Sequence, residues 1–160
     1  MIFGAILAEG TGSRMHMADM PKQFLPLGDK PIVVHTLEKF LTSTKIDEIY
    51  IGVHPDWVGF MADLVEKHIP DSKKVKIVSG GSDRNETILN IVKALEEAHG
   101  ESDYHIIVTH DSVRPFVSLR MIEENIEAAI KYGAVDTVTP AIDTIVVSED
   151  NDTAIEDSVS

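Results

Sequence analysis

The sequence has 160 residues, of which 43% are hydrophobic and 26% charged, and its formal net charge is −13 at pH 7. This length is typical of one domain with a single core, and no run approaches the ~18 consecutive apolar residues of a transmembrane helix. The negative charge disfavours nucleic acid or an anionic membrane as a partner, because both bind clustered basic side chains. The absence of cysteine excludes a disulfide scaffold and a thiolate metal site, and we expect a cytoplasmic protein.

Strand-like apolar runs alternate with helical patterns along most of the chain. The predicted strands are 2–7, 48–53, 75–79, 104–109 and 134–138, and the predicted helices lie within 32–41, 57–68, 85–98 and 119–132. Strict alternation with near-continuous apolar strands is typical of a parallel sheet covered by helices on both faces. We therefore predict an α/β fold with a doubly wound, mostly parallel Rossmann-like sheet.

The first predicted strand is followed by a loop that suits a phosphate. Ligands of an open parallel sheet bind beside the carboxyl ends of its strands. Here Gly10 and Gly12 leave room for a phosphate to approach backbone amides, and Arg14 and Lys22 add positive charge. A dinucleotide fingerprint does not fit, because Met15 stands where its third glycine belongs, and a Walker loop does not fit either. The alternative is a solvated glycine turn.

A second loop, "GGSDRNET" at 80–87, joins a predicted strand to a helix. The paired glycines Gly80 and Gly81 can offer main-chain groups to a flat ligand, and the hydroxyl of Thr87 can reach inward. Asp83 with Glu86 resembles a capping box. Helix capping alone would also explain the polar residues of this loop.

A third loop, "THDSVRPF" at 109–116, follows the next predicted strand. Asp111 can hold a divalent cation or a hydroxyl, and Arg114 can grip a phosphate with its guanidinium group. The alternative is an internal ion pair between these two residues that stiffens the turn. The seven histidines show no metal-ligand spacing, and we expect Trp57 and Phe60 to be core residues.

Together, in this order, the three loops resemble those of the cytidylyltransferases that couple CTP to a polyol phosphate. That family includes enzymes for 2-C-methyl-D-erythritol 4-phosphate, in isoprenoid synthesis, and for ribitol 5-phosphate, in teichoic-acid synthesis for the cell wall. The resemblance runs from Met1 to about Val147 and is strongest in "PKQFLPLGDKPIVVHTLEKF". Gln23 after Lys22 separates this group from the hexose-1-phosphate nucleotidyltransferases.

The choice of acceptor depends on three further stretches. "GGSDRNETI", "VTHDSVRPF" and "GAVDTVTPAIDTIV" resemble the ribitol branch more than the methylerythritol branch. The predicted reaction is therefore transfer of CMP from CTP to D-ribitol 5-phosphate, which gives CDP-ribitol and pyrophosphate. 2-C-methyl-D-erythritol 4-phosphate is the alternative acceptor. The competing hypotheses are a nucleotidyltransferase with another base or acceptor and a non-catalytic nucleotide-binding fragment.

The resemblance implies a fold of the nucleotidyltransferase type A and a role for each matched position. Arg14 and Lys22 are the implied catalytic residues, on the phosphates of CTP. The acceptor is expected at Asp111 and Arg114, and at Thr144 of a neighbouring subunit in a homodimer. The cofactor is Mg²⁺, held mainly by phosphates, with Asp111 as the candidate protein ligand. The implied CTP-binding residues are Leu7, Ala8, Gly10, Gly12, Gly80, Gly81, Thr87 and Ser112.

The resemblance also divides the chain and exposes two departures. Residues 1–139 correspond to the nucleotide-binding core, and 140–160 to the start of a dimerisation arm that looks truncated, so we expect CTP binding without full transfer activity. Glu9 stands where the family has glycine or alanine. A carboxylate beside a bound triphosphate repels it, and we expect this interference to outweigh any attraction of magnesium.

Overall fold

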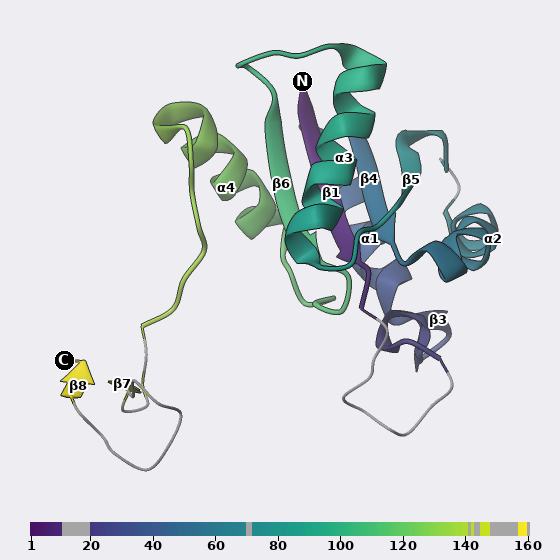
Figure 1. Cartoon of the computed structure of the whole chain (residues 1–160), viewed down its shortest axis with the longest axis horizontal. Helices are drawn as coiled ribbons and strands as arrows, with labels where there is room; N and C mark the ends of the chain where they lie inside the picture. The colour runs from purple at the N-terminus through teal and green to yellow at the C-terminus, as the bar shows by residue number, and fades with distance from the viewer. Residues whose placement is uncertain (11–19, 70–71, 141, 143–144, 148–156, 160) are drawn as a thin grey trace.

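A parallel four-stranded sheet forms the centre of the protein (Figure 1). The computed structural model describes residues 1–10, 20–69, 72–140, 142, 145–147 and 157–159. The strands lie side by side in the order β5–β4–β1–β6, and all their pairings are parallel. Their bounds are β1 (Ile2–Ala8), β4 (Glu48–Val53), β5 (Val75–Ser79) and β6 (Ile106–Asp111).

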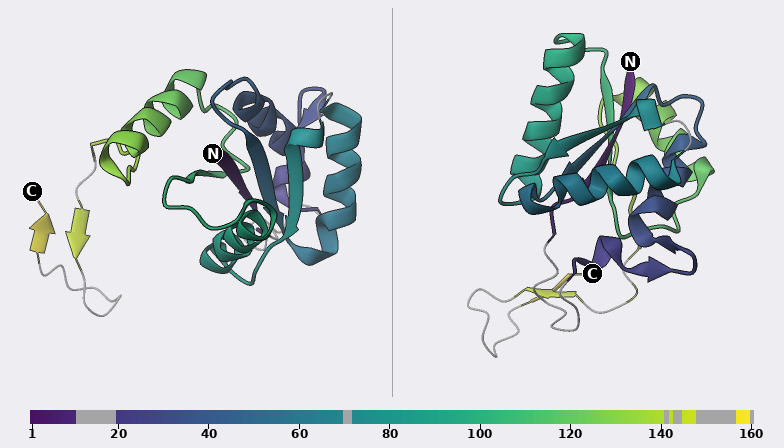
Figure 2. Two further views of the ribbon diagram at one scale, coloured as in Figure 1. Left: turned by 90° about the horizontal axis from the view of Figure 1, so that it is seen from above. Right: turned by 90° about the vertical axis from the view of Figure 1, so that its right-hand side faces the viewer.

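Helices cover both faces of this sheet (Figure 2). They are α1 (Ile32–Leu41), α2 (Val58–His68), α3 (Arg84–His99) and α4 (Leu119–Tyr132). Alternate residues of β1 point to opposite faces: Phe3 and Leu7 pack with α3, while Ile6 and Ala8 belong to the core formed with α1, α2 and α4. The predicted doubly wound α/β fold is therefore confirmed, and the predicted helices all form.

Two strand predictions need correction. The strand predicted at 104–109 is β6, which begins at Ile106, because the N–H of His105 donates to the carbonyl of Ser102 in a turn. The strand predicted at 134–138 is wrong, since this segment forms no strand and is exposed. A groove of about 1080 Å³ lies between residues 134–138 and β6. The backbone of this segment is therefore too far from β6 to pair with it. The Thr137 hydroxyl instead donates to Asn125 of α4 (2.9 Å).

The remaining elements are short. A 3-10 turn, η1 (Lys22–Phe24), leads into a hairpin of β2 (Pro26–Leu27) and β3 (Lys30–Pro31) that the sequence analysis missed, although Gly28 at its tip has a φ of +70°. Two more 3-10 turns are η2 (Pro55–Trp57) and η3 (Ser72–Lys74). Strands β7 (Ile145–Val147) and β8 (Asp157–Val159) pair antiparallel, away from the sheet (Figure 1).

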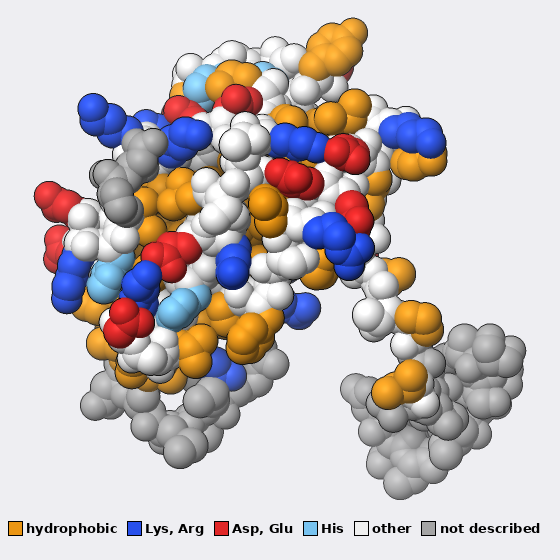
Figure 3. Space-filling view, turned by 180° about the vertical axis from the view of Figure 1, so that it is seen from behind, with side chains coloured by type: hydrophobic (Ala, Val, Ile, Leu, Met, Phe, Trp, Pro, Cys, Tyr) orange, Lys and Arg blue, Asp and Glu red, His pale blue; other side chains and the backbone are white. Residues whose placement is uncertain are grey.

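Charged side chains of both signs are mixed on the surface seen from behind (Figure 3). Viewed from behind, Lys and Arg side chains are interspersed with Asp and Glu, and no single-charge region covers this face (Figure 3). None of the helices in the described ranges is long and apolar enough to cross a membrane.

Candidate active site

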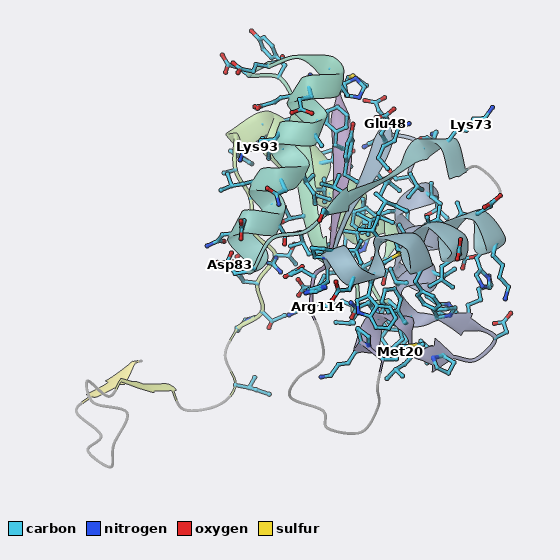
Figure 4. All side chains as sticks on the ribbon, turned by 45° about the vertical axis from the view of Figure 1, so that its right-hand side comes forward. Met20, Glu48, Lys73, Asp83, Lys93 and Arg114 are labelled. Carbon is cyan, nitrogen blue, oxygen red and sulfur yellow. The ribbon has the colours of Figure 1, made fainter. Side chains whose placement is uncertain are left out.

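The three predicted loops lie at one end of the sheet. Asp83 and Arg114 are found at the end opposite Glu48, which begins β4 (Figure 4). The first loop follows β1, the second joins β5 to α3, and the third follows β6. This is the edge where open parallel sheets bind their ligands.

Gln23 holds the entrance to the first loop. Its side-chain amide donates to the carbonyl oxygens of Ala8 (2.8 Å) and Gly10 (2.9 Å), so both N–H groups are used. Only 3% of Gln23 is exposed. The sequence analysis treated this residue only as a family marker, and nothing in one sequence would reveal a contact to a loop thirteen residues earlier. Gln23 fixes the carbonyls of Ala8 and Gly10, and hence the backbone from which the first loop starts.

Lys22 is positioned by the same short turn. The N–H of Leu25 donates to the Lys22 carbonyl (3.1 Å), and Phe24, two residues after Lys22, is buried. Its ring packs against Trp57 (5.2 Å between centroids) and Phe60 (5.0 Å). These aromatic residues therefore anchor the turn, but the expectation that they are core residues needs correction, because Trp57 is only partly buried and Phe60 is 37% exposed.

The second loop is organised by the hydroxyl of Thr87. This oxygen accepts from the N–H of Gly81 (2.9 Å) and donates to the carbonyl of Asp83 (2.8 Å). Thr87 is fully buried at 0% exposure, and its methyl group packs on β4 so tightly that a Cβ at Gly52 would lie 2.3 Å away. Thr87 thus shapes the loop itself, and its expected contact with a base stays a prediction.

The polar residues of this loop also cap α3. The Asp83 carboxylate accepts from the N–H of Glu86 (2.8 Å), as predicted for a capping box. The Glu86 carboxylate, however, accepts from the N–H and hydroxyl of Ser82 (both 2.7 Å) rather than from the N–H of Asp83. These hydrogen bonds from Ser82 lower the pKa of Glu86. Capping accounts for these polar residues but not for the glycines.

The glycines differ in what surrounds them. A Cβ on Gly81 would lie 2.3 Å from Cγ of Glu86, so only glycine fits there. A Cβ on Gly80 would lie 3.1 Å from the Thr87 hydroxyl and 3.3 Å from Cβ of Glu9. Gly10 has open space around it. The two loops therefore meet at Gly80 and Glu9, beside an open position at Gly10.

Asp111 connects the second and third loops. Its carboxylate forms ion pairs with Arg84, the first residue of α3, and with Arg114, whose Nε lies 2.8 Å from Oδ2. The internal Asp111–Arg114 pair considered from the sequence is therefore present. Arg84 was missed, because its position in a helical pattern gives no sign of a partner 27 residues away. The two guanidinium groups remain half to three-quarters exposed and can meet an anion.

Every pair of loops is in contact. The N–H of Ser112 donates to the carbonyl of Leu7 (2.9 Å), which joins the third loop to the first. Ser112 is buried, and its own carbonyl accepts from the Thr36 hydroxyl (2.8 Å). Glu9 lies beside Gly80, which joins the first loop to the second, and the ion pair of Arg84 with Asp111 joins the second loop to the third. The ends of β1, β5 and β6 therefore form one continuous edge.

Some expected site residues cannot be placed. Arg14, Gly12 and Thr144 lie outside the described residues. Within the described ranges, no group of three or more His, Asp or Glu side chains could hold a metal ion. Both oxygens of Asp111 already face arginines.

Residues 2–159 match the family described as 2-C-methyl-D-erythritol 4-phosphate cytidylyltransferase (IspD). The chain belongs to this family. Members of the IspD family are CTP-dependent cytidylyltransferases. The loop geometry above is therefore that of an IspD-family core, and the part of the sequence reading that named this family of cytidylyltransferases is confirmed.

Solved structures agree with the IspD assignment. The chain is 25% identical to 4-diphosphocytidyl-2C-methyl-D-erythritol synthase of Anaerococcus prevotii, with a TM-score of 0.76, covering 99% of this chain and 64% of that one. It is 21% identical to 2-C-methyl-D-erythritol 4-phosphate cytidylyltransferase of Francisella tularensis, with a TM-score of 0.71, covering 99% of this chain and 65% of that one. The chain thus spans slightly less than two thirds of these proteins.

Proposed function

We propose that this protein binds CTP at the three linked strand ends and transfers its CMP group to a polyol phosphate. The observation that carries the proposal is the mutual contact of the loops through Ser112 with Leu7, Glu9 with Gly80, and Arg84 with Asp111. A nucleotide and an acceptor bound at neighbouring loops of one rigid edge can be held in line for reaction.

The first loop suits the triphosphate and the second the base. The backbone after Ala8 is fixed by Gln23, Gly10 is open, and Lys22 stands on an anchored turn. Gly12 and Arg14 complete this phosphate loop in the proposal. Gly80 and Gly81 keep the second loop free of side chains, so that a flat base can lie against it.

The third loop suits the acceptor. Arg114 and Arg84 bring two guanidinium groups to Asp111. A phosphate monoester can replace one carboxylate contact, because guanidinium binds both anions with the same paired geometry. Asp111 then remains to hold the arginines in place and to accept hydrogen bonds from the polyol hydroxyls.

The reaction needs no general base. A phosphate monoester with a second pKa of about 6 is mostly dianionic at pH 7. One of its oxygens attacks the α-phosphorus of CTP, a new P–O bond forms, the bond to the β-phosphate oxygen breaks, and pyrophosphate leaves with the electron pair. Lys22 and Arg14 stabilise the charge that develops on the transferring and leaving phosphates.

Magnesium is proposed only as a companion of the phosphates. The described residues offer no acidic cluster for it, and Asp111 is engaged by two arginines. These residues do not fit a protein-held magnesium site, so no step of the reaction is assigned to one. Phosphate oxygens are the ligands that Mg²⁺ commonly takes from nucleotides.

We favour 2-C-methyl-D-erythritol 4-phosphate as the acceptor, and isoprenoid synthesis as the context. The family description and the names of the Anaerococcus and Francisella proteins support this choice over the ribitol 5-phosphate predicted from the sequence. Ribitol 5-phosphate stays the second candidate, because the loops at 80–88 and 108–116 resemble that branch.

A homodimer and the role of Thr144 belong to the same proposal. The strands β7 and β8 pair with each other at the end of an exposed segment, apart from the sheet. This supports an arm that reaches a second copy, and the division into a core over 1–139 and an arm over 140–160.

The test measures pyrophosphate release from CTP with each acceptor in turn. We expect release with 2-C-methyl-D-erythritol 4-phosphate, less with ribitol 5-phosphate, and none without an acceptor. The Asp111→Asn variant should raise the KM for the acceptor without changing CTP affinity, whereas Asp103→Asn, at an exposed turn before β6, should change neither. No release with any acceptor, together with no CTP binding by the folded protein, would refute the proposal.

A further inference from the structure

Glu9 is the acidic side chain that the proposed chemistry does not use. It directly follows β1 at the edge where the first and second loops meet. Its carboxylate oxygen Oε2 is buried and has no hydrogen-bond partner among the residues that the structure describes. A buried polar atom without a partner is unfavourable and uncommon in native proteins, so this acceptor is a candidate for contact with a ligand.

The second loop lacks free donors beside this acceptor. The N–H of Gly80 donates to the carbonyl of Val53 (2.7 Å), and the N–H of Gly81 donates to the Thr87 hydroxyl (2.9 Å). The Thr87 hydroxyl in turn gives its proton to Asp83. With these donors already used, the carboxylate of Glu9 is the strongest hydrogen-bonding group left among the described residues at this corner. A ligand edge that fits here must therefore bring a donor of its own.

We propose that Glu9 selects the base of the nucleotide by accepting a hydrogen bond from the exocyclic amino group of cytosine. This inference rests on the proposed function, which puts the base against Gly80 and Gly81. Cytosine carries an amino donor where uracil carries a carbonyl acceptor. A charged acceptor strengthens the hydrogen bond to cytosine, whereas uracil would set its oxygen against the carboxylate.

This role differs from the interference that the sequence suggested for Glu9. General repulsion of the triphosphate weakens CTP and UTP equally, because the two nucleotides carry the same phosphates. Base selection changes the ratio of their affinities. The ratio of the two dissociation constants therefore separates the two roles within one protein.

The experiment measures CTP and UTP binding by isothermal titration without an acceptor, for the parent protein, Glu9→Gln and Glu9→Ala. We expect the parent to favour CTP about ten- to a hundredfold, which corresponds to one well-placed hydrogen bond and its unpaired counterpart. Both variants should lose most of this preference, and Glu9→Gln should gain UTP affinity, because its amide can donate to uracil.

Two controls keep the result interpretable. Glu101→Gln removes one exposed carboxylate just after the distant end of α3 and should leave the ratio unchanged. Thermal unfolding of each variant checks its fold. If Glu9→Ala does not fold, the nearly isosteric Glu9→Gln still decides.

Two outcomes would overturn the inference. One is an unchanged ratio in the Glu9 variants, including an equal gain in affinity for both nucleotides, and the other is a parent protein that does not prefer CTP to UTP. Each of these leaves CTP binding, and with it the proposed function, intact. Failure of the folded parent to bind either nucleotide would instead remove the proposed function and this inference together.

Discussion

The strands β1 and β4 differ sharply from β6. Every residue of β1 after Ile2 and of β4 after Glu48 is buried, whereas no residue of β6 is fully buried. β1 pairs with strands on both sides, while β6, among the described strands, pairs only with β1 and borders the groove of about 1080 Å³ beneath α4. Close packing restricts movement of β1 and β4, and with it movement of Ala8 at the end of β1.

This difference in burial suggests that the two sides of the sheet have different roles in ligand binding. The first loop, proposed for the phosphates of CTP, follows the buried strand β1, and the second loop, proposed for the base, is held by the fully buried Thr87. The loop after β6, proposed for the acceptor, is tied by ion pairs between half-exposed side chains. We therefore expect less rearrangement on ligand binding at Ala8, Gly10 and Gly80 than at the side chains of Asp111 and its two arginines. The following variants test that contrast, from the largest expected effect to the smallest.

The largest effect is expected for Lys22→Ala, at the proposed CTP site. Loss of a positioned charge near the reacting phosphates typically lowers the rate about a hundred- to a thousandfold. Pyrophosphate release should fall by this factor while thermal stability stays the same. Lys93→Ala, on an exposed part of α3, serves as the control. Equal rates for the two variants would remove Lys22 from the chemistry.

Gly52→Ala should be the most destabilising small change in the core. The added Cβ would lie 2.3 Å from Cγ2 of Thr87 and 3.1 Å from Cδ1 of Ile91. Overpacking of this kind costs about 1–3 kcal/mol, and chemical denaturation should show that loss in the free energy of unfolding. Gly59→Ala, in α2 with open space around it, should instead stabilise by up to ~1 kcal/mol. Similar behaviour of both variants would contradict the tight contact of α3 with β4.

Alkaline pH should lower the free energy of unfolding through ionisation of Tyr50, which lies on the buried strand β4. Burial, with a contribution from the charge of Glu48, raises the pKa of Tyr50 from 10.0 to about 12. Because the folded pKa is the higher one, this stabilisation is complete below pH 10.0 and is lost as the pH rises through about 12. The loss should reach about 2 kcal/mol at pH 12.

Denaturation curves of the parent and of Tyr50→Phe across this range measure the effect. The variant lacks the ionisable group and should lose about 2 kcal/mol less than the parent. Tyr104→Phe is the control, because this ring is 88% exposed. Identical pH profiles for the parent and Tyr50→Phe would show that Tyr50 is more solvated than the packing indicates.

The smallest effect is expected at the groove beside β6. Phe116 borders the groove and is 90% exposed. Phe116→Ser should change the free energy of unfolding by less than ~0.5 kcal/mol, as exposed substitutions usually do. A loss of several kcal/mol in thermal or chemical denaturation would mean that this side is covered in solution.

Local patterns predicted most of the fold. The apolar runs gave the four sheet strands, and the helical spacing of Ile88, Ile91 and Leu95 gave α3, because these signals depend only on neighbouring residues. The strand predicted at 134–138 failed, because a strand requires an edge to pair with, and β-branched composition alone does not supply one. The brief hairpin at 26–31 is too short to show an alternating pattern.

The site was predictable where a strand end carries an unusual loop. Gly80, Gly81, Asp111 and Arg114 were proposed from that rule, and the structure brings their loops to one end of the sheet, while their roles stay predictions. Gln23 and Arg84 act through contacts to distant segments, which no spacing reveals. The acceptor was assigned from short motifs alone, and the choice between 2-C-methyl-D-erythritol 4-phosphate and ribitol 5-phosphate stays a proposal.

A crystal structure with bound CTP tests the central claim most directly. We predict that the triphosphate lies at Gly10 beside Lys22 and that the base lies against Gly80 and Gly81, with the backbone at these four residues almost unchanged. A nucleotide found instead in the groove between β6 and α4, with the first two loops empty, would contradict the account.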